Sequence, residues 1–256
     1  MSHLDTLVTN EQVIPVIESE LFAHRPDARF AIGVVAVGDE IIPGLEAEAQ
    51  AYYRLRAGVY AYQTNMIDHG LVDENGTEHD HDDQRSLHFT VVENLGQAQR
   101  IVAAMRLIKK QGNNLPLPIE DFFPEVFTDN PAPENSLEVS RYICRHEDKR
   151  IQNNLKWPLY SLALSDIIKN DHAPTYAVVE EFLKNDFIKH GVPFTPIAEP
   201  KFVEEYNDEN LGMTIDTAQL SKHVEKLQPG LLSAMMAAEG DFVYFGKQNT
   251  QPVEAA

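Results

Sequence analysis

The chain has 256 residues, of which 43% are hydrophobic, and this length and composition favour one globular domain with a sizeable core. A net charge of −19, from 40 acidic and 21 basic residues, argues against nucleic-acid binding because the mean field repels phosphates. The single cysteine excludes an intramolecular disulfide and a cysteine-based zinc cluster.

The chain shows no segment typical of membrane insertion or export. No apolar run approaches the length of about eighteen residues that a transmembrane helix needs. The first residues, Met1 to Asp5, lack the basic start and apolar region of a signal peptide. We therefore expect a cytoplasmic protein.

In the first half of the chain, helix and strand signals alternate. Asn10 is a typical N-cap residue, so a helix is predicted over 11–24. The short apolar run 28–37 predicts a strand, and residues 44–64 predict a long helix from apolar side chains near helical spacing. The polar stretch 68–84 has no such period and is predicted to be a loop.

The second half predicts a strand hairpin, a proline-rich connection, and then alternating strands and helices. In chain order these are the hairpin of Ser86–Asn94 with Gln99–Ile108, the connection 111–135, strand Leu137–Arg145, helix Glu147–Asn170, strand Thr175–Val179, helix Glu181–His190, strand Phe194–Val203 and helix Asp216–Leu227. This order predicts a mixed α/β protein rather than a doubly wound parallel sheet. A dinucleotide or P-loop site is not expected, because neither glycine-rich motif occurs.

Five short motifs follow one another between about residues 52 and 170. They are Arg56 with Tyr60 four residues later, Glu78-x-Asp80-x-x-Asp83 before a strand, Arg106-Leu107 near the end of the next strand, Phe123-Pro124-x-x-Phe127, and Glu138-x-Ser140-Arg141 within a strand. In this order they resemble the acyl-homoserine-lactone synthases and their relatives, the N-acyl amino acid synthases and exosortase-associated acyltransferases. The resemblance implies the GNAT fold, with a mixed, mostly antiparallel central sheet flanked by helices. It also implies one acyltransferase domain over 1–256, with a core of about 28–228 and a loose C-terminal tail.

The activity that the resemblance implies is N-acyl transfer. A fatty acyl chain would move from acyl carrier protein or acyl-CoA to the amine of a small acceptor, with no tightly bound cofactor. The acceptor stays open between S-adenosylmethionine, which would give the quorum-sensing signal acyl-homoserine lactone, and an amino acid. Met66 stands where the synthases carry Trp, which slightly favours the amino acid. The alternative is a non-catalytic GNAT-fold protein that binds acyl-lipid or a carrier protein.

Three residues of the last motif would carry the reaction. Glu138 is the candidate base, and its apolar strand neighbours would raise its proton affinity. Ser140 is a candidate hydrogen-bond donor to the thiol leaving group. Glu138 and Arg141 would point to opposite faces of a regular strand, and a β-bulge between them would bring them to one side. The resemblance implies such a bulge, because the GNAT fold has one in this strand.

Further residues would bind substrate and carrier. The resemblance assigns substrate contacts to Arg56, Tyr60, Glu78, Asp80, Asp83, Arg106 and Phe123, and the four residues Arg56, Asp80, Asp83 and Arg106 predict a mixed-charge network. The segment after the last motif lacks glycine, which disfavours a pyrophosphate loop. Its cations would instead meet the acidic acyl carrier protein; they are Arg145, Lys149, Arg150 and Lys156.

Two groups that could suggest other chemistry are given structural interpretations. His79, His81 and His88 lie in or near the acidic motif, but this spacing is common by chance and no metal is expected. Cys144 has no neighbour in sequence that would activate a thiolate, so it is interpreted as a packed thiol.

Overall fold

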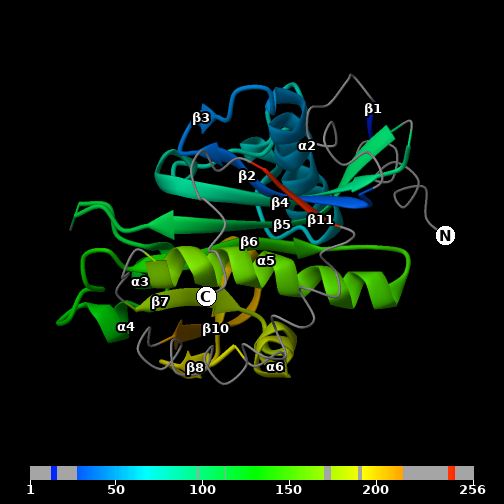
Figure 1. Ribbon diagram of the computed structural model, residues 1–256. Coiled ribbons are helices and arrows are strands. Elements are labelled where there is room, and N and C mark those ends of the chain that lie inside the picture. Colours follow the sequence, from blue (N-terminus) through cyan, green and yellow to red (C-terminus); the bar gives the residue numbers. More distant parts are fainter. Residues whose placement is uncertain are drawn as a thin grey trace.

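The computed structural model describes residues 13–15, 28–96, 98–112, 114–169, 174–189, 192–215 and 242–245. These residues form an 11-stranded sheet with helices on both faces (Figure 1). The strands are β1 (Val13–Pro15), β2 (Phe30–Val37), β3 (Glu40–Ile41), β4 (Ser86–Asn94), β5 (Ala98–Lys109), β6 (Leu137–Cys144), β7 (Thr175–Val179), β8 (Thr195–Pro196), β9 (Lys201–Val203), β10 (Asp208–Ile215) and β11 (Phe242–Phe245). The helices are α2 (Glu46–Arg56), the π-helical segment η2 (Ala57–Gln63), α3 (Pro118–Phe122), α4 (Pro124–Phe127), α5 (Lys149–Lys169) and α6 (Glu181–Lys189), with single 3-10 turns η3 (His69–Leu71), η4 (Asp83–Arg85) and η5 (Glu204–Tyr206).

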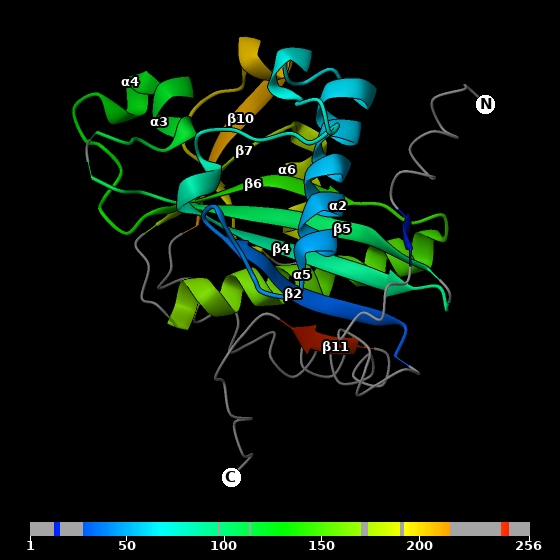
Figure 2. The same ribbon diagram turned by 90° about the horizontal axis from the view of Figure 1, so that it is seen from above.

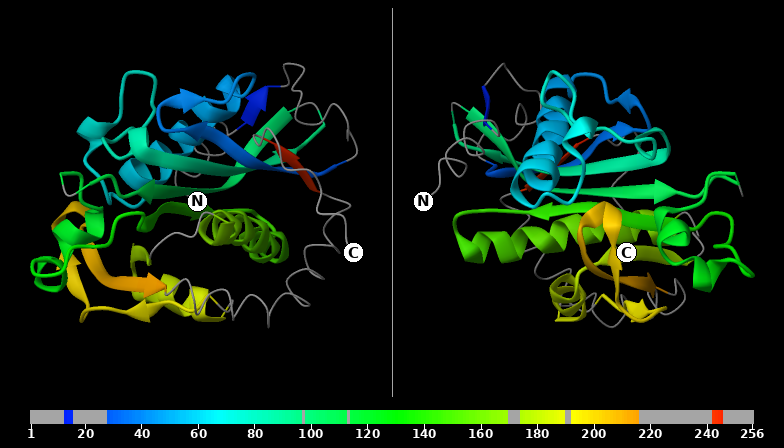
Figure 3. Two further views of the ribbon diagram at one scale, coloured as in Figure 1. Left: turned by 60° about the vertical axis from the view of Figure 1, so that its left-hand side comes forward. Right: turned by 180° about the vertical axis from the view of Figure 1, so that it is seen from behind.

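The central strands are buried on both faces because each face is covered by a helix. Phe89 and Val91 of β4 belong to the core cluster that contains the apolar residues of α5. Val92 of the same strand belongs to a second cluster with α2. The views from above and along α5 show α2 and α5 on opposite sides of the sheet (Figures 2 and 3). The predicted mixed α/β architecture is therefore confirmed.

The order of the main strands is β11-β2-β4-β5-β6-β7-β10-β8. Neighbouring strands are antiparallel except in the pairs β11–β2 and β6–β7. The parallel ladder between β6 and β7 is short. Leu137–Val139 of β6 pairs with Thr175–Ala177 of β7, and no pairing follows. β6 continues to Cys144 and β7 to Val179, so the two strands separate beyond Val139. This separation opens the sheet at its middle.

Two predicted elements differ in the structure, and one strand was not predicted. The helix predicted over 11–24 is wrong for 13–15, which pair with β5 as strand β1. The strand predicted over Phe194–Val203 is two short strands, β8 and β9, that pair with different parts of β10. Strand β10 was not predicted, since its polar start and Gly212 hide the strand pattern.

The predicted helix Asp216–Leu227 and the tail after Phe245 lie outside the described residues. Among the helices that the structure describes, none has the length and apolar character needed to cross a membrane.

Candidate active site

A bulge in β6 sets the direction of the candidate catalytic side chains. Ser140 pairs with Arg106 and Ile143 with Ala104, so β6 has one residue more than β5 between these pairs. Arg141 has a φ of +50°, which is unusual for a residue with a side chain.

The bulge reverses the alternation of β6. Before it, Leu137 and Val139 pack on the α5 side. After it, Tyr142 packs on that side and Ile143 joins the α2 cluster. Arg141 thus reaches Glu78 and Asp80 on the α2 side. The expected bulge is present, although among the described residues Arg141 forms no hydrogen bond or ion pair with Glu138.

The end of the second helix is distorted where it meets this bulge. The predicted helix 44–64 is α-helical to Arg56 and π-helical over η2. Such π segments commonly occur at functional sites. Within η2, the Tyr60 hydroxyl donates to the Tyr142 carbonyl at 2.8 Å, and the Arg141 guanidinium lies 5.3 Å from the Tyr60 ring centroid. Tyr60 therefore supports the bulge from the α2 side.

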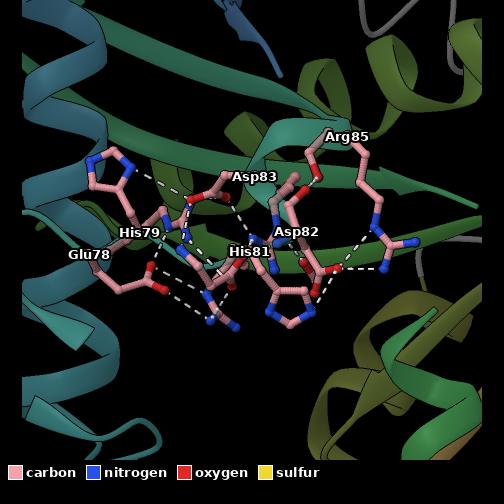
Figure 4. Close-up of polar contacts among 12 residues, drawn as sticks. Glu78, His79, His81, Asp82, Asp83 and Arg85 are labelled. Carbon is pink, nitrogen blue, oxygen red and sulfur yellow. Dashed lines mark hydrogen bonds and ion pairs between the residues drawn. The ribbon is translucent and has the colours of Figure 1, made fainter. Parts of the chain in front are cut away.

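Three arginines and three acids form a buried ion-pair network beside the bulge. They are Arg56, Arg106, Arg141, Glu78, Asp80 and Asp83. Two of these acids, Glu78 and Asp83, are labelled in Figure 4. The network joins helix α2, strands β5 and β6, and the loop that precedes β4. The three positive and three negative charges balance, which is the condition under which a buried charge cluster is tolerated.

Asp83 is the centre of this network. Its Oδ1 accepts from Nη1 of Arg56 at 2.7 Å and from Nη1 of Arg106 at 2.6 Å. Its Oδ2 accepts from the Asp80 N–H at 3.1 Å, which fixes the turn between the two acids. Arg106 also donates from Nε to Ser140 Oγ at 2.8 Å and so links the network to the bulge.

The other two acids hold Arg141. Its Nη2 donates to Glu78 Oε1 at 3.0 Å and to Asp80 Oδ2 at 2.9 Å. Glu78 also pairs with Arg56, with both side chains fully buried. Burial alone would raise the pKa of Glu78, but Arg56 and Arg141 outweigh it and hold this pKa below its ordinary value. The acids are therefore ionised and the predicted mixed-charge network is present.

Glu138 lies on the face of β6 that also carries the ion-pair network, but its environment is different. Its side chain is buried, and its Oε2 accepts from the Ile119 N–H at 2.9 Å. Burial raises the pKa of Glu138 to about 8, against the lowering effect of that hydrogen bond. A carboxyl group with such a pKa can take up a proton near neutral pH, which suits a general base.

A cavity of about 830 Å³ opens where β6 and β7 separate. Its wall includes Glu138 and all the residues from Val139 to Cys144, together with Val178–Glu180 at the end of β7. Tyr60 and Met66 contribute from the second helix and the turn after it. The candidate base, the bulge and the aromatic of the first motif thus border one space.

Phe123 is placed elsewhere. It is fully buried in a third core cluster with Leu117, Ile119 and Phe127, and it is not among the residues that line the cavity. A Cβ on Gly212 of β10 would come within 3.2 Å of the Phe123 ring, so this strand packs tightly on it. Phe123 is therefore a core residue that packs against β7 and β10.

The basic residues after β6 have two different environments. Arg145, Lys149 and Arg150 are exposed, and the first two border the cavity. Lys156 also borders the cavity but is paired with Asp186, with 13% of its side chain exposed. Only the first three therefore have the exposure that the predicted carrier-protein contact requires.

The histidines near the acidic motif differ in burial, since His88 lies in the interior whereas His79 and His81 are exposed. His88 is buried, and burial lowers its pKa to about 3, so the ring is neutral. Its Nε2 lies 3.3 Å from the Asp83 carbonyl, which can only accept, so Nδ1 accepts from the Tyr52 hydroxyl at 3.0 Å. His79 stacks on Tyr53 at 3.9 Å. Within the described ranges, no three His, Cys, Asp or Glu side chains are arranged to hold a metal ion.

Cys144 has the properties of a packed thiol. It donates to the Gln152 carbonyl at 3.2 Å, and burial raises its pKa to about 12. A thiol with this pKa is a poor nucleophile at neutral pH.

Sequence reasoning missed Tyr206 and Glu180, which also line the cavity. Tyr206 follows β9 in a 3-10 turn, and its ring packs edge-on against Phe122 at 5.1 Å. Glu180 directly follows β7, and its pKa is raised to about 7 by burial and by the neighbouring Asp208. Neither residue belongs to a recognisable motif, so only the separation of β6 from β7 could have indicated them.

Solved structures of similar fold are reported for a group of acyl-transfer enzymes. The CoA-dependent acyl-homoserine lactone synthase BjaI, with SAM and isopentyl-CoA, is 19% identical and has a TM-score of 0.59, over 87% of this chain and 95% of its own. The acyl-homoserine lactone synthase LasI is 16% identical with a TM-score of 0.56, over 74% of this chain and 91% of its own. The chain has the fold of the acyl-homoserine lactone synthases. This confirms the GNAT-type fold expected from the five motifs.

The N-acyl amino acid synthase FeeM from uncultured soil microbes shares the same fold. It is 12% identical with a TM-score of 0.51, over 77% of this chain and 95% of its own. No protein-family model and no curated protein matches the sequence.

Proposed function

We propose that this protein is an N-acyltransferase that moves an acyl group from a thioester donor to the amine of a small acceptor. The observation that carries the proposal is the position of Glu138, a buried carboxyl with a pKa of about 8, at the wall of the cavity between the separated strands. The acyl-homoserine lactone synthase and N-acyl amino acid synthase folds support the same class of reaction.

The donor would lie in the opening between β6 and β7. Beyond Val139 the backbone of β6 is no longer paired with β7, so an extended thioester arm can run beside it. The exposed residues Arg145, Lys149 and Arg150 at this end carry positive charge on a protein that is otherwise strongly acidic. We assign them to docking of an acyl carrier protein, itself acidic, rather than to binding of a small cofactor.

The acceptor would bind on the α2 side of the bulge. Asp80 is the most exposed acid of the network, with 13% of its side chain accessible, and can contact an ammonium or sulfonium group. Among the described residues, Nη1 of Arg141 has no hydrogen-bond partner, so it can donate to a carboxylate. S-adenosylmethionine and free amino acids both carry these two groups.

The reaction would proceed by addition and elimination. The acceptor amine attacks the thioester carbonyl carbon, and Glu138 takes the amine proton, directly or through a water. The tetrahedral intermediate then collapses as its C–S bond breaks, forming the amide and releasing the thiol. Because Ser140 Oγ accepts from Arg106, its hydroxyl hydrogen can form a hydrogen bond to the departing sulfur. The proton that Glu138 took from the amine then passes to the thiolate, which leaves as the thiol and restores the Glu138 carboxylate.

The test is mass spectrometry of lipid extracts from cells that overproduce the protein, beside cells with the Glu138→Gln variant. Glu134→Gln is the matched control, since this exposed carboxylate is not among the residues lining the cavity. A product lost only in Glu138→Gln supports the proposal. An acyl-homoserine lactone would identify S-adenosylmethionine as acceptor, and an N-acyl amino acid would identify a free amino acid.

One outcome would count against catalysis by this protein. Purified protein that binds acyl-carrier protein but transfers nothing to either type of acceptor would refute the enzyme and favour a non-catalytic binding protein.

A further inference from the structure

The ion pair between Lys156 of α5 and Asp186 of α6 lies inside the cavity. Both residues line it, and Lys156 Nζ donates to Asp186 Oδ1 at 2.8 Å and to Oδ2 at 2.7 Å. Their side chains are only 13% and 20% exposed. This pair connects the two helices on the side of the sheet opposite the acid–arginine network.

Aromatic side chains lie near the pair, since Tyr142 and Phe187 line the same cavity and Tyr160 interacts with Asp186. The Tyr160 hydroxyl donates to the Tyr142 hydroxyl at 3.1 Å, and their rings stack with centroids 5.6 Å apart. Phe187, in the core, lies 5.4 Å from the Tyr160 ring and 5.8 Å from the Tyr142 ring. Tyr142 belongs to the bulge itself, so this aromatic group lies directly across β6 from the candidate catalytic face.

The wall of the cavity thus changes in character along its length. Between the strands it offers apolar side chains, among them Val139, Val178 and Val179. At the α5–α6 junction it offers an ion pair. Each methylene that an alkyl chain buries against apolar groups makes binding more favourable. Burial against a charged pair does not, because the chain displaces water without replacing its hydrogen bonds.

We propose that the Lys156–Asp186 ion pair is the specificity determinant that ends the acyl-binding part of the cavity and so limits the length of saturated acyl chain that this protein accepts. This inference rests on the proposed function, because it assumes that the donor's acyl group enters between β6 and β7 and reaches the α5–α6 side. It assigns Lys156 to acyl selection in place of the carrier-protein contact expected from the sequence.

The test measures binding of a homologous series of S-alkyl pantetheine thioethers by calorimetry. In the wild-type protein, affinity should rise about fourfold with each methylene and then stop rising at a defined chain length. The double variant Lys156→Met with Asp186→Leu replaces the ion pair by apolar side chains. The affinity of this variant should continue to rise for at least two more methylenes, so that the longest ligands bind at least about sixteenfold more tightly than to wild type.

Two further variants complete the design. Lys156→Arg keeps the ion pair and adds bulk, so its affinity should stop rising at a shorter chain length than in wild type. Lys201→Met with Glu125→Leu removes an ion pair whose residues are not among those lining the cavity, and it should leave the profile unchanged.

The proposal would be overturned if affinity stops rising at the same chain length in wild type, in Lys156→Arg and in the apolar double variant. If the double variant does not fold, the shift in Lys156→Arg decides the question alone. The binding measurement needs no turnover, so a protein that shows the shifted profile without transferase activity refutes the proposed function and supports the acyl-chain limit.

Discussion

Tyr60 and Tyr142, 82 residues apart in sequence, are joined by a hydrogen bond from the Tyr60 hydroxyl to the Tyr142 carbonyl at 2.8 Å. The donor belongs to the π-helical segment and the acceptor to the bulge of β6. The same Tyr60 ring lies beside the Arg141 guanidinium. One side chain therefore couples the distortion of the helix to the distortion of the strand, on the two sides of the proposed acceptor site.

Replacing Tyr60 by Phe should weaken this coupling. The ring beside Arg141 remains, but the Tyr142 carbonyl loses its donor, so we expect the free energy of unfolding to fall by about 1 kcal/mol. The value of kcat/KM should fall about tenfold as the bulge loses its support. Urea denaturation and steady-state kinetics measure both effects. Tyr62→Phe is the control, because Tyr62 lies in the same segment with 47% of its surface exposed. Equal effects of the two substitutions would contradict the role of Tyr60.

Replacing Asp83 by Asn should destabilise the protein strongly. The change removes the shared acceptor of Arg56 and Arg106 and leaves the buried network with an excess positive charge. Breaking such a buried pair costs about 3–5 kcal/mol of unfolding free energy. Glu125→Gln, which removes an exposed partner of Lys201, should cost less than about 1 kcal/mol. Chemical denaturation of both variants tests the difference, and similar losses would show that the network is not a buried unit.

Glu138 should make stability fall as pH rises. The folded protein holds this proton up to a pKa of about 8, whereas the unfolded chain releases it near the ordinary value of 4.5. Between these values the folded state binds one more proton than the unfolded state, so Glu138 contributes a loss of about 1.4 kcal/mol of unfolding free energy per pH unit. Glu138→Gln should remove that contribution. Urea unfolding across this pH range measures it, and parallel curves for the two proteins would refute the raised pKa.

The exposed basic residues should affect carrier-protein donors selectively. Lys149→Glu with Arg150→Glu should raise the KM for acyl-carrier protein about tenfold, because the two reversed charges repel an acidic partner. The KM for an acyl-pantetheine donor should stay unchanged. Added salt should raise the wild-type KM for the carrier protein by screening the same attraction. Lys109→Glu, an exposed cation that is not among the residues lining the cavity, is the control. Equal KM changes for both donors would argue against protein docking here.

Much of the candidate site could be predicted because its residues occur in short motifs. Arg56, Asp80, Asp83 and Arg106 indicated a mixed-charge network, and the structure contains it. The hairpin of β4 and β5 was predictable as well, because its strands carry long apolar runs around a short turn. Local patterns of this kind persist when the chain folds.

Other features have no local signature. The strand β10 begins Asp208-Glu209-Asn210, which reads as a polar loop, and it is a strand because β7 offers it an edge to pair with. Lys156 looks like one more exposed cation of α5. In the folded protein it lines the cavity, where its Nζ pairs with Asp186 Oδ1 of another helix at 2.8 Å.

The order of the main elements and four members of the charge network, Arg56, Asp80, Asp83 and Arg106, could thus be read from short motifs in the sequence, whereas the places of Glu78 and Arg141 in that network could not. The tertiary structure decided the direction of Arg141, the separation of β6 from β7 and the raised pKa of Glu138. Each of these depends on contacts across the sheet. A backbone bulge, an open ladder and a desolvated carboxyl group arise only when strands and helices distant in sequence pack together.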